Sequence, residues 1–246
     1  MPPRPVGLAI KASRARRRSS RTGGRVRRIL FGGLLVLLIG PPALLLVYRF
    51  LPVPITPLMV IRLIEGEGLR KRWVALEEIA PVLPQAVVAA EDNRFCAHAG
   101  FDWRELQGQI DALRAGEPAR GASTITMQTA KNLFLWPDRS LLRKALEAWL
   151  TPQIELLWPK RRIVEVYLNV AELGPGIYGA EAAAQAHFGK PARTLSLQEA
   201  ALLAAILPNP RMWSPRRPTA YLQGRARTIR SRIEQLGPLL ACVGSA

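Results

Sequence analysis

Apolar residues recur at helical spacing along most of this chain. Across residues 103–113 the apolar positions 106, 110 and 113 fall on one side of a helix. The same periodicity predicts further helices over these ranges: about 84–91, 123–135, 140–150, 159–169, 180–188, 197–207 and 220–236. Strand-like alternation of Val, Ile and Thr is scarce. We therefore expect a mainly α-helical body that forms one domain.

Residues that begin, break or end helices support these boundaries. Ser140 precedes one apolar run as an N-cap, and Ser196 with Glu199 forms a capping box before another. Pro152 interrupts the run that follows Ser140 and should kink or restart that helix. Residues 174–179, rich in glycine, indicate a turn between helices.

The longest apolar stretch lies near the N-terminus. Residues 29–48 are twenty residues without a charge, and a helix of that length spans about 30 Å, the thickness of a bilayer core. A cleaved signal peptide would have a shorter apolar core and a small-x-small cleavage site, but Arg49 and a proline-rich segment follow instead. We therefore expect an uncleaved transmembrane anchor, in which Pro41 and Pro42 should kink the helix.

Positive charge is concentrated before this stretch. The chain holds 35 Lys and Arg against 18 Asp and Glu, and residues 1–28 carry ten basic residues and no acid. A basic arm can bind nucleic acid, but beside an apolar span it marks the cytoplasmic side and attracts anionic lipid. We expect no nucleic-acid partner, an N-terminus on the cytoplasmic side of the inner membrane, and a periplasmic body.

These patterns divide the chain into four segments. Residues 1–28 form a basic cytoplasmic tail and residues 29–48 a transmembrane anchor. Residues 49–80 are a linker and membrane-proximal segment, in which 58–64 is either a short strand or a helix. Residues 81–246 form the main domain.

The cysteines and histidines indicate no metal site. Cys96 and Cys242 lack metal-ligand spacing, and His98 and His187 are too few and too scattered for zinc. An oxidising compartment would permit a disulfide, but the sequence does not establish its geometry, and we assume none.

Glu91 is the first candidate for chemistry. An apolar run over 82–90 ends in Glu91 and Asp92, and an aromatic residue, His98 and Gly100 follow. A helix that delivers a carboxylate into a polar turn can supply a general base, which must lie within hydrogen-bond reach of its substrate proton. The alternative is an ordinary solvated helix end.

A second candidate is the helix start after Gly121. Ser123 and Thr124 precede a helical run that contains Gln128 and Lys131. A capped helix with no further role is one interpretation. A surface of hydroxyl, amide and ammonium groups that binds a phosphate or a sugar is the other.

A third candidate lies on the helix that follows Ser140. Arg143 and Glu147 are four residues apart and Lys144 and Glu147 three apart, so the three side chains share a helix face. By itself this pattern is typical of a surface ion-pair cluster that contributes little to stability.

Five separated stretches together resemble one enzyme family. They are, in chain order, 91–95 with His98 and Gly100; 121–126 with Gln128 and 131–133; Arg143, Lys144 and Glu147; 162–169 with Gly174 and Gly179; and 199–204 with Pro208. This series resembles the glycosyltransferases that polymerise peptidoglycan, a family formed by the transglycosylase module of bifunctional penicillin-binding proteins and its single-domain, membrane-anchored relatives. Each motif alone is weak evidence for the family, but the occurrence of all five in this order across roughly residues 80–210 is specific to it.

The resemblance implies a fold and a reaction. The fold is mainly α and lysozyme-like, with an apolar surface that enters the bilayer. The reaction joins the 4-hydroxyl of lipid II to the chain carried on undecaprenyl diphosphate, forming a β-1,4 bond with inversion and releasing the diphosphate. Lipid II, the growing glycan strand and membrane lipid are the partners we expect, together with other cell-wall synthesis and division proteins.

The resemblance also implies residue roles. Glu91 is the general base, and Glu147 is the second family carboxylate, which helps to organise the donor site or its cations. The residues expected to bind substrate or diphosphate are Asp92, Ser123, Thr124, Gln128, Lys131, Asn132, Arg139, Arg143 and Lys144. A departing diphosphate needs positive charge nearby, and a divalent cation, Mg²⁺ or Mn²⁺, is the one cofactor we expect there.

Two other functions are compatible with parts of the sequence. A lysozyme-like glycan-cleaving enzyme needs a carboxylic acid but neither the anchor nor the cationic residues. A non-catalytic membrane scaffold of the cell-wall machinery needs neither Glu91 nor Glu147 in its motif.

Overall fold

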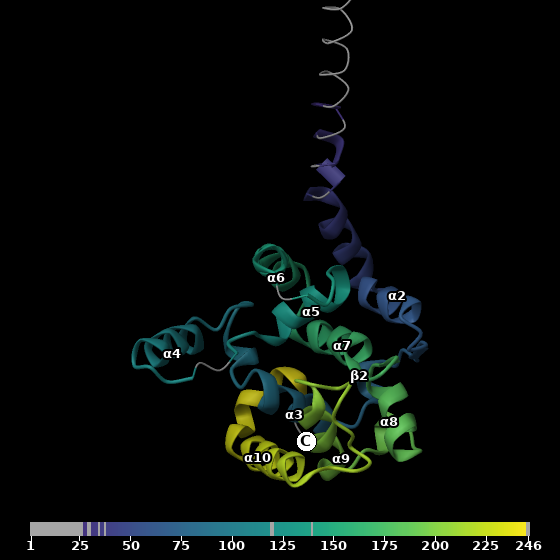
Figure 1. Ribbon diagram of the computed structural model, residues 1–246, viewed down its shortest axis with the longest axis vertical. Helices are drawn as coiled ribbons and strands as arrows, with labels where there is room; N and C mark the ends of the chain where they lie inside the picture. The colour runs from purple at the N-terminus through teal and green to yellow at the C-terminus, as the bar shows by residue number, and fades with distance from the viewer. Residues whose placement is uncertain are drawn as a thin grey trace, which may run out of the picture. The chain divides into compact units, whose positions relative to one another are not determined.

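The computed structural model of the chain describes residues 27–28, 31–33, 35–36, 38–118, 121–138 and 140–244. Helices dominate (Figure 1). The labelled elements are α2 (Pro57–Ile64), β1 (Arg70–Lys71), η1 (Leu76–Glu78), α3 (Val82–Glu91), η2 (Phe95–Ala97), α4 (Trp103–Arg114), α5 (Ile125–Phe134), α6 (Leu141–Leu157), α7 (Lys160–Val170), β2 (Glu172–Gly174), β3 (Ile177–Tyr178), α8 (Ala180–Phe188), η3 (Ala192–Thr194), α9 (Leu197–Ile206), α10 (Ala220–Leu236) and η4 (Gly237–Val243). The mainly α-helical fold predicted from apolar spacing is confirmed.

The chain divides into two compact units, Met1–Leu44 and Leu45–Ala246. Among the described residues, one helix, Phe31–Tyr48, is long and apolar enough to cross a membrane. Its helical assignment continues through Pro41 and Pro42. Most of the basic tail, residues 1–26, lies outside the described residues.

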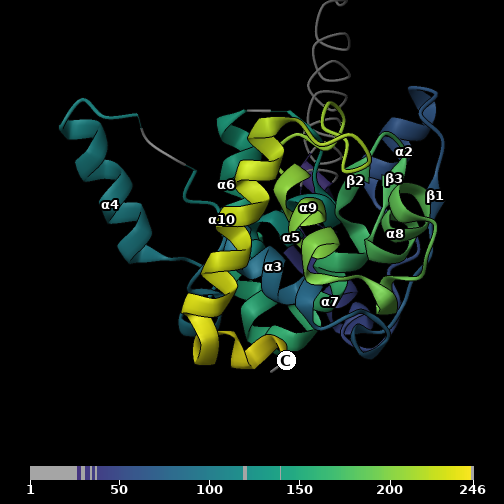
Figure 2. The ribbon, with the colours of Figure 1, turned by 90° about the horizontal axis from the view of Figure 1, so that it is seen from below.

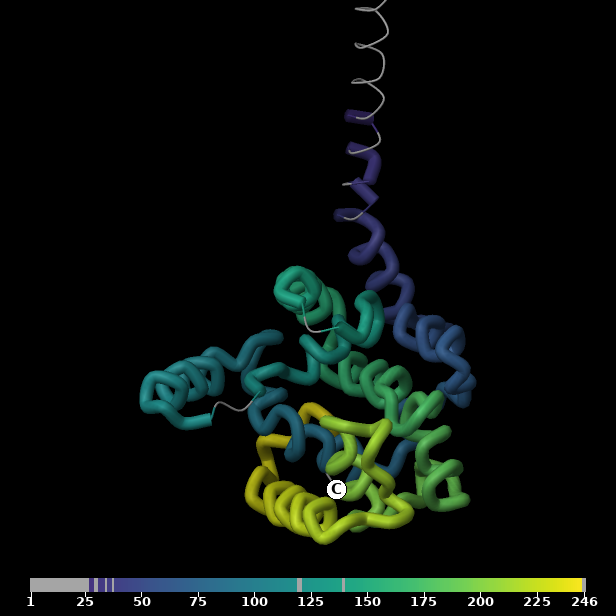
Figure 3. The backbone as a smooth tube through the Cα atoms, viewed as in Figure 1, coloured from purple at the N-terminus to yellow at the C-terminus, as the bar shows by residue number. Residues whose placement is uncertain are grey.

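The core of the second unit is built around α9. Every residue of α9 from Ala200 to Ile206 is buried, and α9 packs against both α3 and α10. Figure 3 shows the C-terminal α10, in yellow, beside the much earlier α3. α3 is buried from Leu83 to Ala89, which explains why its sequence is largely apolar, and its buried Gln85 donates a hydrogen bond to the Gly244 carbonyl. This packing fixes the direction in which the end of α3 points.

A second group of helices contains α5, α6 and α7, and α5 contacts both of the others. α6 is continuous through Pro152, so the predicted kink or restart does not end the helix. Proline removes one backbone donor, and here the carbonyl that loses its partner belongs to Ala148, which, like Pro152, lies on the exposed side of α6. The carbonyl therefore belongs to a residue outside the protein core.

Residues 49–80, expected as a linker, lie within the second unit. The stretch over 58–64 is the helix α2, which settles the choice between strand and helix. β1 pairs in parallel with β3, and β3 pairs antiparallel with β2. The predicted turn over 174–179 is thus the end of a short hairpin. Gly176 is required there because its φ is +66° and an added Cβ would lie 2.2 Å from the Glu67 carbonyl oxygen.

α4 extends away from the other helices of the second unit, as both Figure 1 and Figure 2 show. The predicted amphipathic helix is confirmed, with Asp102 as its N-cap. None of its residues is buried, so its apolar stripe does not contribute to the core.

The assumption that the cysteines do not pair is wrong. Cys96 in η2 and Cys242 in η4 form a disulfide, although they are 146 residues apart in sequence. η2 packs against η4, so the cross-link holds the C-terminal segment beside the loop that follows α3. Pairing depends on this long-range contact, which the spacing of the cysteines does not reveal.

Removing the disulfide is expected to lower the stability of the protein substantially. The cross-link closes a long loop, and in the chain-entropy account its loss costs about 2–5 kcal/mol of unfolding free energy. Thermal unfolding of the full chain in detergent, with and without dithiothreitol and for the Cys96→Ser/Cys242→Ser variant, checks this. A midpoint that stays the same in all three samples would contradict it.

Candidate functional site

Glu91 is the last residue of α3, where the buried helix meets polar surroundings. Its side chain is only 14% exposed. Glu91 Oε2 accepts a hydrogen bond of 2.9 Å from Gln128 Nε2 on α5, and Glu91 Oε1 lies 3.4 Å from Arg225 Nη2 on α10. The carboxylate predicted as a general base is therefore held on a rigid helix and contacted by two other helices.

α5 carries several predicted site residues on one face. Gln128 and Lys131 are three residues apart and so occupy neighbouring positions on the helix. Gln128 Oε1 accepts a hydrogen bond of 2.9 Å from the hydroxyl of Tyr167 on α7. Lys131 and Asn132 line a cavity together with Gln128. One helix thus connects the Glu91 carboxylate to a cationic chamber.

Glu147 lies at the centre of a buried ion cluster on α6. Its side chain is 4% exposed, and its two oxygens accept hydrogen bonds from Arg143 Nη1 and, at 2.8 Å, from Lys144 Nζ. Lys144 Nζ also donates to Ser123 Oγ at 2.9 Å. The ion pairs expected from the spacing are present, but Glu147 and Arg143 are withdrawn from solvent whereas Lys144 is 42% exposed, so the cluster does not lie wholly on the surface.

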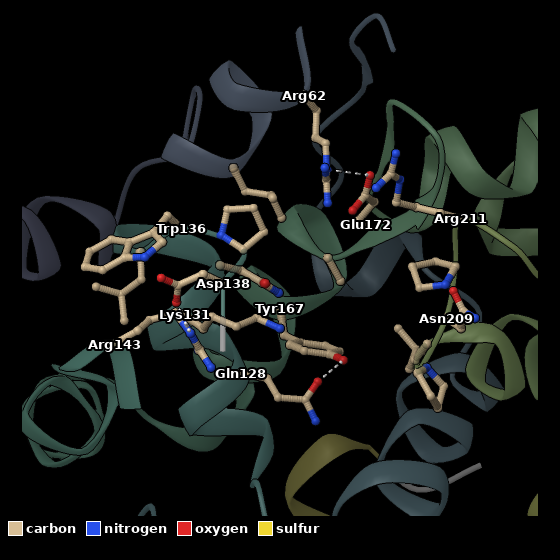
Figure 4. A pocket seen from close by; sticks show the side chains of 18 residues that line it. Arg62, Gln128, Lys131, Trp136, Asp138, Arg143, Tyr167, Glu172, Asn209 and Arg211 are labelled. Carbon is tan, nitrogen blue, oxygen red and sulfur yellow. Dashed lines mark hydrogen bonds and ion pairs between the residues drawn. The ribbon is translucent and has the colours of Figure 1, made fainter. Parts of the chain in front are cut away.

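A cavity of about 350 Å³ lies on the far side of Gln128 (Figure 4). Its wall combines cationic, acidic, amide and aromatic side chains, among them Arg62, Gln128, Lys131, Asn132, Trp136, Asp138, Arg143, Tyr167, Glu172, Asn209 and Arg211. Neither Glu91 nor Glu147 is among the described residues that line it. Glu91 borders the chamber through Gln128, and Glu147 borders it through Arg143.

Lys131, which lines this chamber, and Lys144, which lies beside its lining residue Arg143, are partly withdrawn from water. Burial, and then the neighbouring Arg143, lower the pKa of Lys131. Burial, then Arg143 and Lys131, lower the pKa of Lys144. Within the described part of the chain the Lys131 ammonium forms no hydrogen bond or ion pair shorter than 4 Å, whereas Arg143 and Lys144 are held by Glu147. A half-buried ammonium that lines a cavity and has no carboxylate in direct contact is suited to an anionic ligand.

Two of the predicted binding residues use their polar atoms inside the protein. Asp92 is buried and accepts hydrogen bonds from His98 Nε2 at 2.9 Å and from the backbone N–H of Ile125 at 3.0 Å. The Thr124 hydroxyl donates to the Gly100 carbonyl and accepts from the Met127 backbone as the N-cap of α5. These residues join the loop after α3 to the start of α5.

The remaining predictions have different outcomes. Gln128 was expected to hold sugar or phosphate, and the structure places its amide on Glu91 and Tyr167. Arg139 lies outside the described residues. No group of three His, Cys, Asp or Glu side chains in the described ranges comes together as a metal site. The presence of a divalent cation stays a prediction.

Sequence reasoning missed several residues of the site. Tyr167 lies in one of the five motifs but has no predicted role there, and Arg225 lies on the predicted last helix, outside all five motifs. Arg62, Glu172 and Arg211 form the opposite wall of the cavity. No local pattern marks these residues, because three distant segments carry them.

Comparisons with known proteins agree with this geometry. A sequence model of the family described as Transglycosylase matches residues 59–234. The chain is 58% identical over 217 residues to the "Biosynthetic peptidoglycan transglycosylase" of Rhodospirillum centenum, covering 87% of this chain and 93% of that protein. It is 51% identical over 204 residues to the protein of the same name from Caulobacter vibrioides, covering 83% and 89%. The chain is 48% identical over 222 residues to the protein of that name from Bdellovibrio bacteriovorus, and the match covers 88% of this chain and 89% of that protein.

Proposed function

The chain belongs to the transglycosylase family of peptidoglycan biosynthesis, and from this premise we propose that it polymerises lipid II with Glu91 as the general base. It is a peptidoglycan glycosyltransferase with a lysozyme-like fold, and lipid II and the glycan strand are its substrates. The assignment of individual residues below is our proposal.

In the proposed reaction, the 4-hydroxyl oxygen of lipid II attacks C1 of the donor sugar. The new C1–O bond forms as the bond from C1 to undecaprenyl diphosphate breaks, with inversion at C1. The hydroxyl proton passes to the Glu91 carboxylate, and the diphosphate leaves with the electron pair of the broken bond. A positioned base of this kind contributes about 10²–10⁴-fold to a rate.

The observation that supports this assignment is the arrangement of one face of α5. Gln128 contacts the base directly, and Lys131, one turn further, lines the cavity with a half-buried ammonium that forms no ion pair within the described ranges. The groups that accept the proton and stabilise the leaving diphosphate are thus brought together along one face of α5. Preorganised positive charge of this kind stabilises the negative charge that develops in the transition state.

Glu147 has a supporting role in this proposal. It holds Arg143, which lines the proposed donor site, and it also binds Lys144, which in turn donates to Ser123. Asp92 and Thr124 are given no contact with substrate, because their polar atoms connect α3 and α5. A divalent cation, Mg²⁺ or Mn²⁺, would add positive charge at the diphosphate, and no step described here depends on it.

We also propose that the second unit lies on the periplasmic side of the inner membrane. The basic residues before the apolar helix favour a cytoplasmic N-terminus. The disulfide between Cys96 and Cys242 supports an oxidising compartment for the body. Interaction with other cell-wall synthesis and division proteins stays a prediction.

The outer side of α6 supports contact with lipid. Its exposed positions are apolar from one end to the other, namely Leu141, Leu142, Ala145, Ala148, Pro152 and Leu156. Leu63 and Ile64 of α2 are exposed as well, and in Figure 1 both helices lie along the upper edge of the second unit. An exposed apolar patch of this kind is typical of a surface that enters a membrane interface.

The proposal is tested by giving the purified full chain, in detergent, labelled lipid II in one reaction and preformed glycan in another. We expect glycan polymer from lipid II and no cleavage of the preformed glycan. Cleavage without polymerisation would show a glycan-cleaving enzyme. No reaction with either substrate, from protein whose thermal transition shows it to be folded, would favour the scaffold.

A further inference from the structure

Four side chains from four helices form a directional chain of contacts that ends at Glu91. The Tyr167 hydroxyl on α7 lies 2.9 Å from Gln128 Oε1 on α5, and Gln128 Nε2 lies 2.9 Å from Glu91 Oε2 at the end of α3. On the other side, Arg225 of α10 approaches Glu91 Oε1 at 3.4 Å. Each carboxylate oxygen therefore has a separate protein donor.

Tyr167 fixes the direction of this chain. Its side chain is 1% exposed, and burial, together with the negative charge of Glu91, raises its pKa well above the ordinary value. The phenol therefore keeps its proton throughout the working pH range and can act as a donor to Gln128 Oε1. Figure 4 shows this hydrogen bond at the lower edge of the cavity.

The orientation of the Gln128 amide follows from that donor. The two ends of a glutamine amide have nearly the same shape, so only hydrogen bonds determine which end faces a neighbour. With its oxygen on Tyr167, the amide presents N–H to Glu91 Oε2. The flipped amide would place two oxygens together, next to an ionised carboxylate.

Arg225 holds the other oxygen more loosely. Arg225 and Arg232 are seven residues apart on α10, on one helix face, and Arg232 Nη1 reaches the Ala89 carbonyl in the last turn of α3 at 3.4 Å. α10 therefore lies along the end of α3 at two points. A contact of 3.4 Å is longer than the usual 2.9–3.0 Å, so Glu91 Oε1 is the oxygen that an incoming hydroxyl can approach more readily.

We propose that Tyr167 and Arg225 are positioning residues for the general base. Tyr167, acting through the Gln128 amide, holds Glu91 Oε2, while Arg225 keeps the carboxylate facing the reacting hydroxyl, so that Oε1 takes the proton. This proposal rests on the proposed role of Glu91. Neither residue touches the reacting atoms.

The test compares Tyr167→Phe with the wild type in initial rates of lipid II polymerisation across pH. We expect kcat to fall about tenfold, the equivalent of one lost hydrogen bond, with KM within about twofold because substrate contacts are retained. The acidic limb of the pH profile should move to higher pH, since the ionised carboxylate loses a donated hydrogen bond when the amide is free to flip.

Tyr178→Phe is the matched control. Tyr178 is fully buried, like Tyr167, but its hydroxyl has no hydrogen-bond partner in the described part of the chain. The same chemical change there should leave kcat and the pH profile as in the wild type. If both variants lost activity equally and without a pH shift, Tyr167 would be only structural and the proposal would be wrong.

Arg225 is tested in the same assay. Arg225→Gln should lower kcat and move the acidic limb upward, and Arg225→Lys should restore part of both because it keeps the charge. An unchanged kcat and profile in Tyr167→Phe and Arg225→Gln, with Glu91→Gln inactive, would overturn the positioning proposal alone. An active Glu91→Gln would instead overturn the base assignment, and the positioning proposal with it.

Discussion

Replacing Glu91 by glutamine is expected to lower the rate of lipid II polymerisation by about three orders of magnitude, within the range of a lost general base. The amide keeps the shape of the carboxylate but cannot take the proton of the acceptor hydroxyl. Initial rates with labelled lipid II, extended to long incubations so that slow product is detected, measure the effect. The loss should appear in kcat rather than KM, because the proton transfer occurs only in the transition state.

The fold of Glu91→Gln should be intact. The new side chain can place its oxygen toward Gln128 Nε2 or its amide toward solvent, so no buried donor loses its only partner. Glu77→Gln is a suitable control, because Glu77 is exposed and ion-paired to Arg161 on the surface, and it should polymerise like the wild type. Substantial residual activity in Glu91→Gln, at a wild-type thermal midpoint, would contradict the base assignment.

The helices of this protein could be predicted from the sequence because local signals agree with the tertiary structure. The last helix was expected at 220–236, and the structure has α10 at Ala220–Leu236. Ser196 and Glu199 form the expected capping box at the start of α9. Thr219 caps α10, and Gly237 follows it. Apolar period and capping residues are properties of a few neighbouring positions, so they can be read locally.

The features that could not be predicted depend on contacts between distant segments. β1 is two residues long and pairs with β3, more than a hundred residues later, so no run of alternating residues marks either strand. Cys96 and Cys242 meet only because η2 and η4 pack together. The sequence also does not show which way a polar side chain points. Asp92 is next to Glu91 in the sequence, but its carboxylate contacts His98 and the start of α5.

The candidate site also has residues that could be predicted from the sequence and contacts that could not. The family motifs identified Glu91, Lys131 and Glu147, because they preserve residue types at fixed spacing. They did not reveal that Tyr167 contacts Gln128 and that Gln128 contacts Glu91, since these hydrogen bonds join α7, α5 and α3. The residues to which we assign the reaction were thus visible in the sequence, whereas the contacts that would orient them were visible only in the fold.

Replacing Lys131 by methionine is expected to reduce polymerisation by about 10²–10³-fold, the usual cost of removing one group that stabilises developing charge. Methionine keeps most of the length and apolar surface of the lysine stem but removes the ammonium that lines the cavity. Initial rates with labelled lipid II measure the loss, and Lys190→Met, whose lysine forms an ion pair with Glu199 and does not line the cavity, is the matched control.

The same variant should be more stable than the wild type. Because burial lowers the pKa of Lys131, the folded protein disfavours its charged form, and at neutral pH, where the lysine is charged, that charge reduces the stability of the fold. Lys131→Met removes this unfavourable term, so its thermal midpoint should rise while its activity falls. A lysine placed there for packing alone would give the opposite pair of results, with a lower midpoint and nearly unchanged rates.

The pH dependence of kcat/KM shows whether the reaction needs the positive charge of Lys131. Since the pKa of Lys131 is lowered, the alkaline limb of kcat/KM should lie below the value of about 10.4 that is usual for lysine. Lys131→Arg keeps its charge throughout this range, so its activity, though lower at neutral pH, should persist to higher pH. An alkaline limb at the same pH in both proteins would assign that limb to another group and remove Lys131 from the diphosphate site. If Lys131→Met is both more stable and less active than the wild type, the half-buried ammonium of Lys131 lowers the stability of the fold and is retained because it binds the diphosphate.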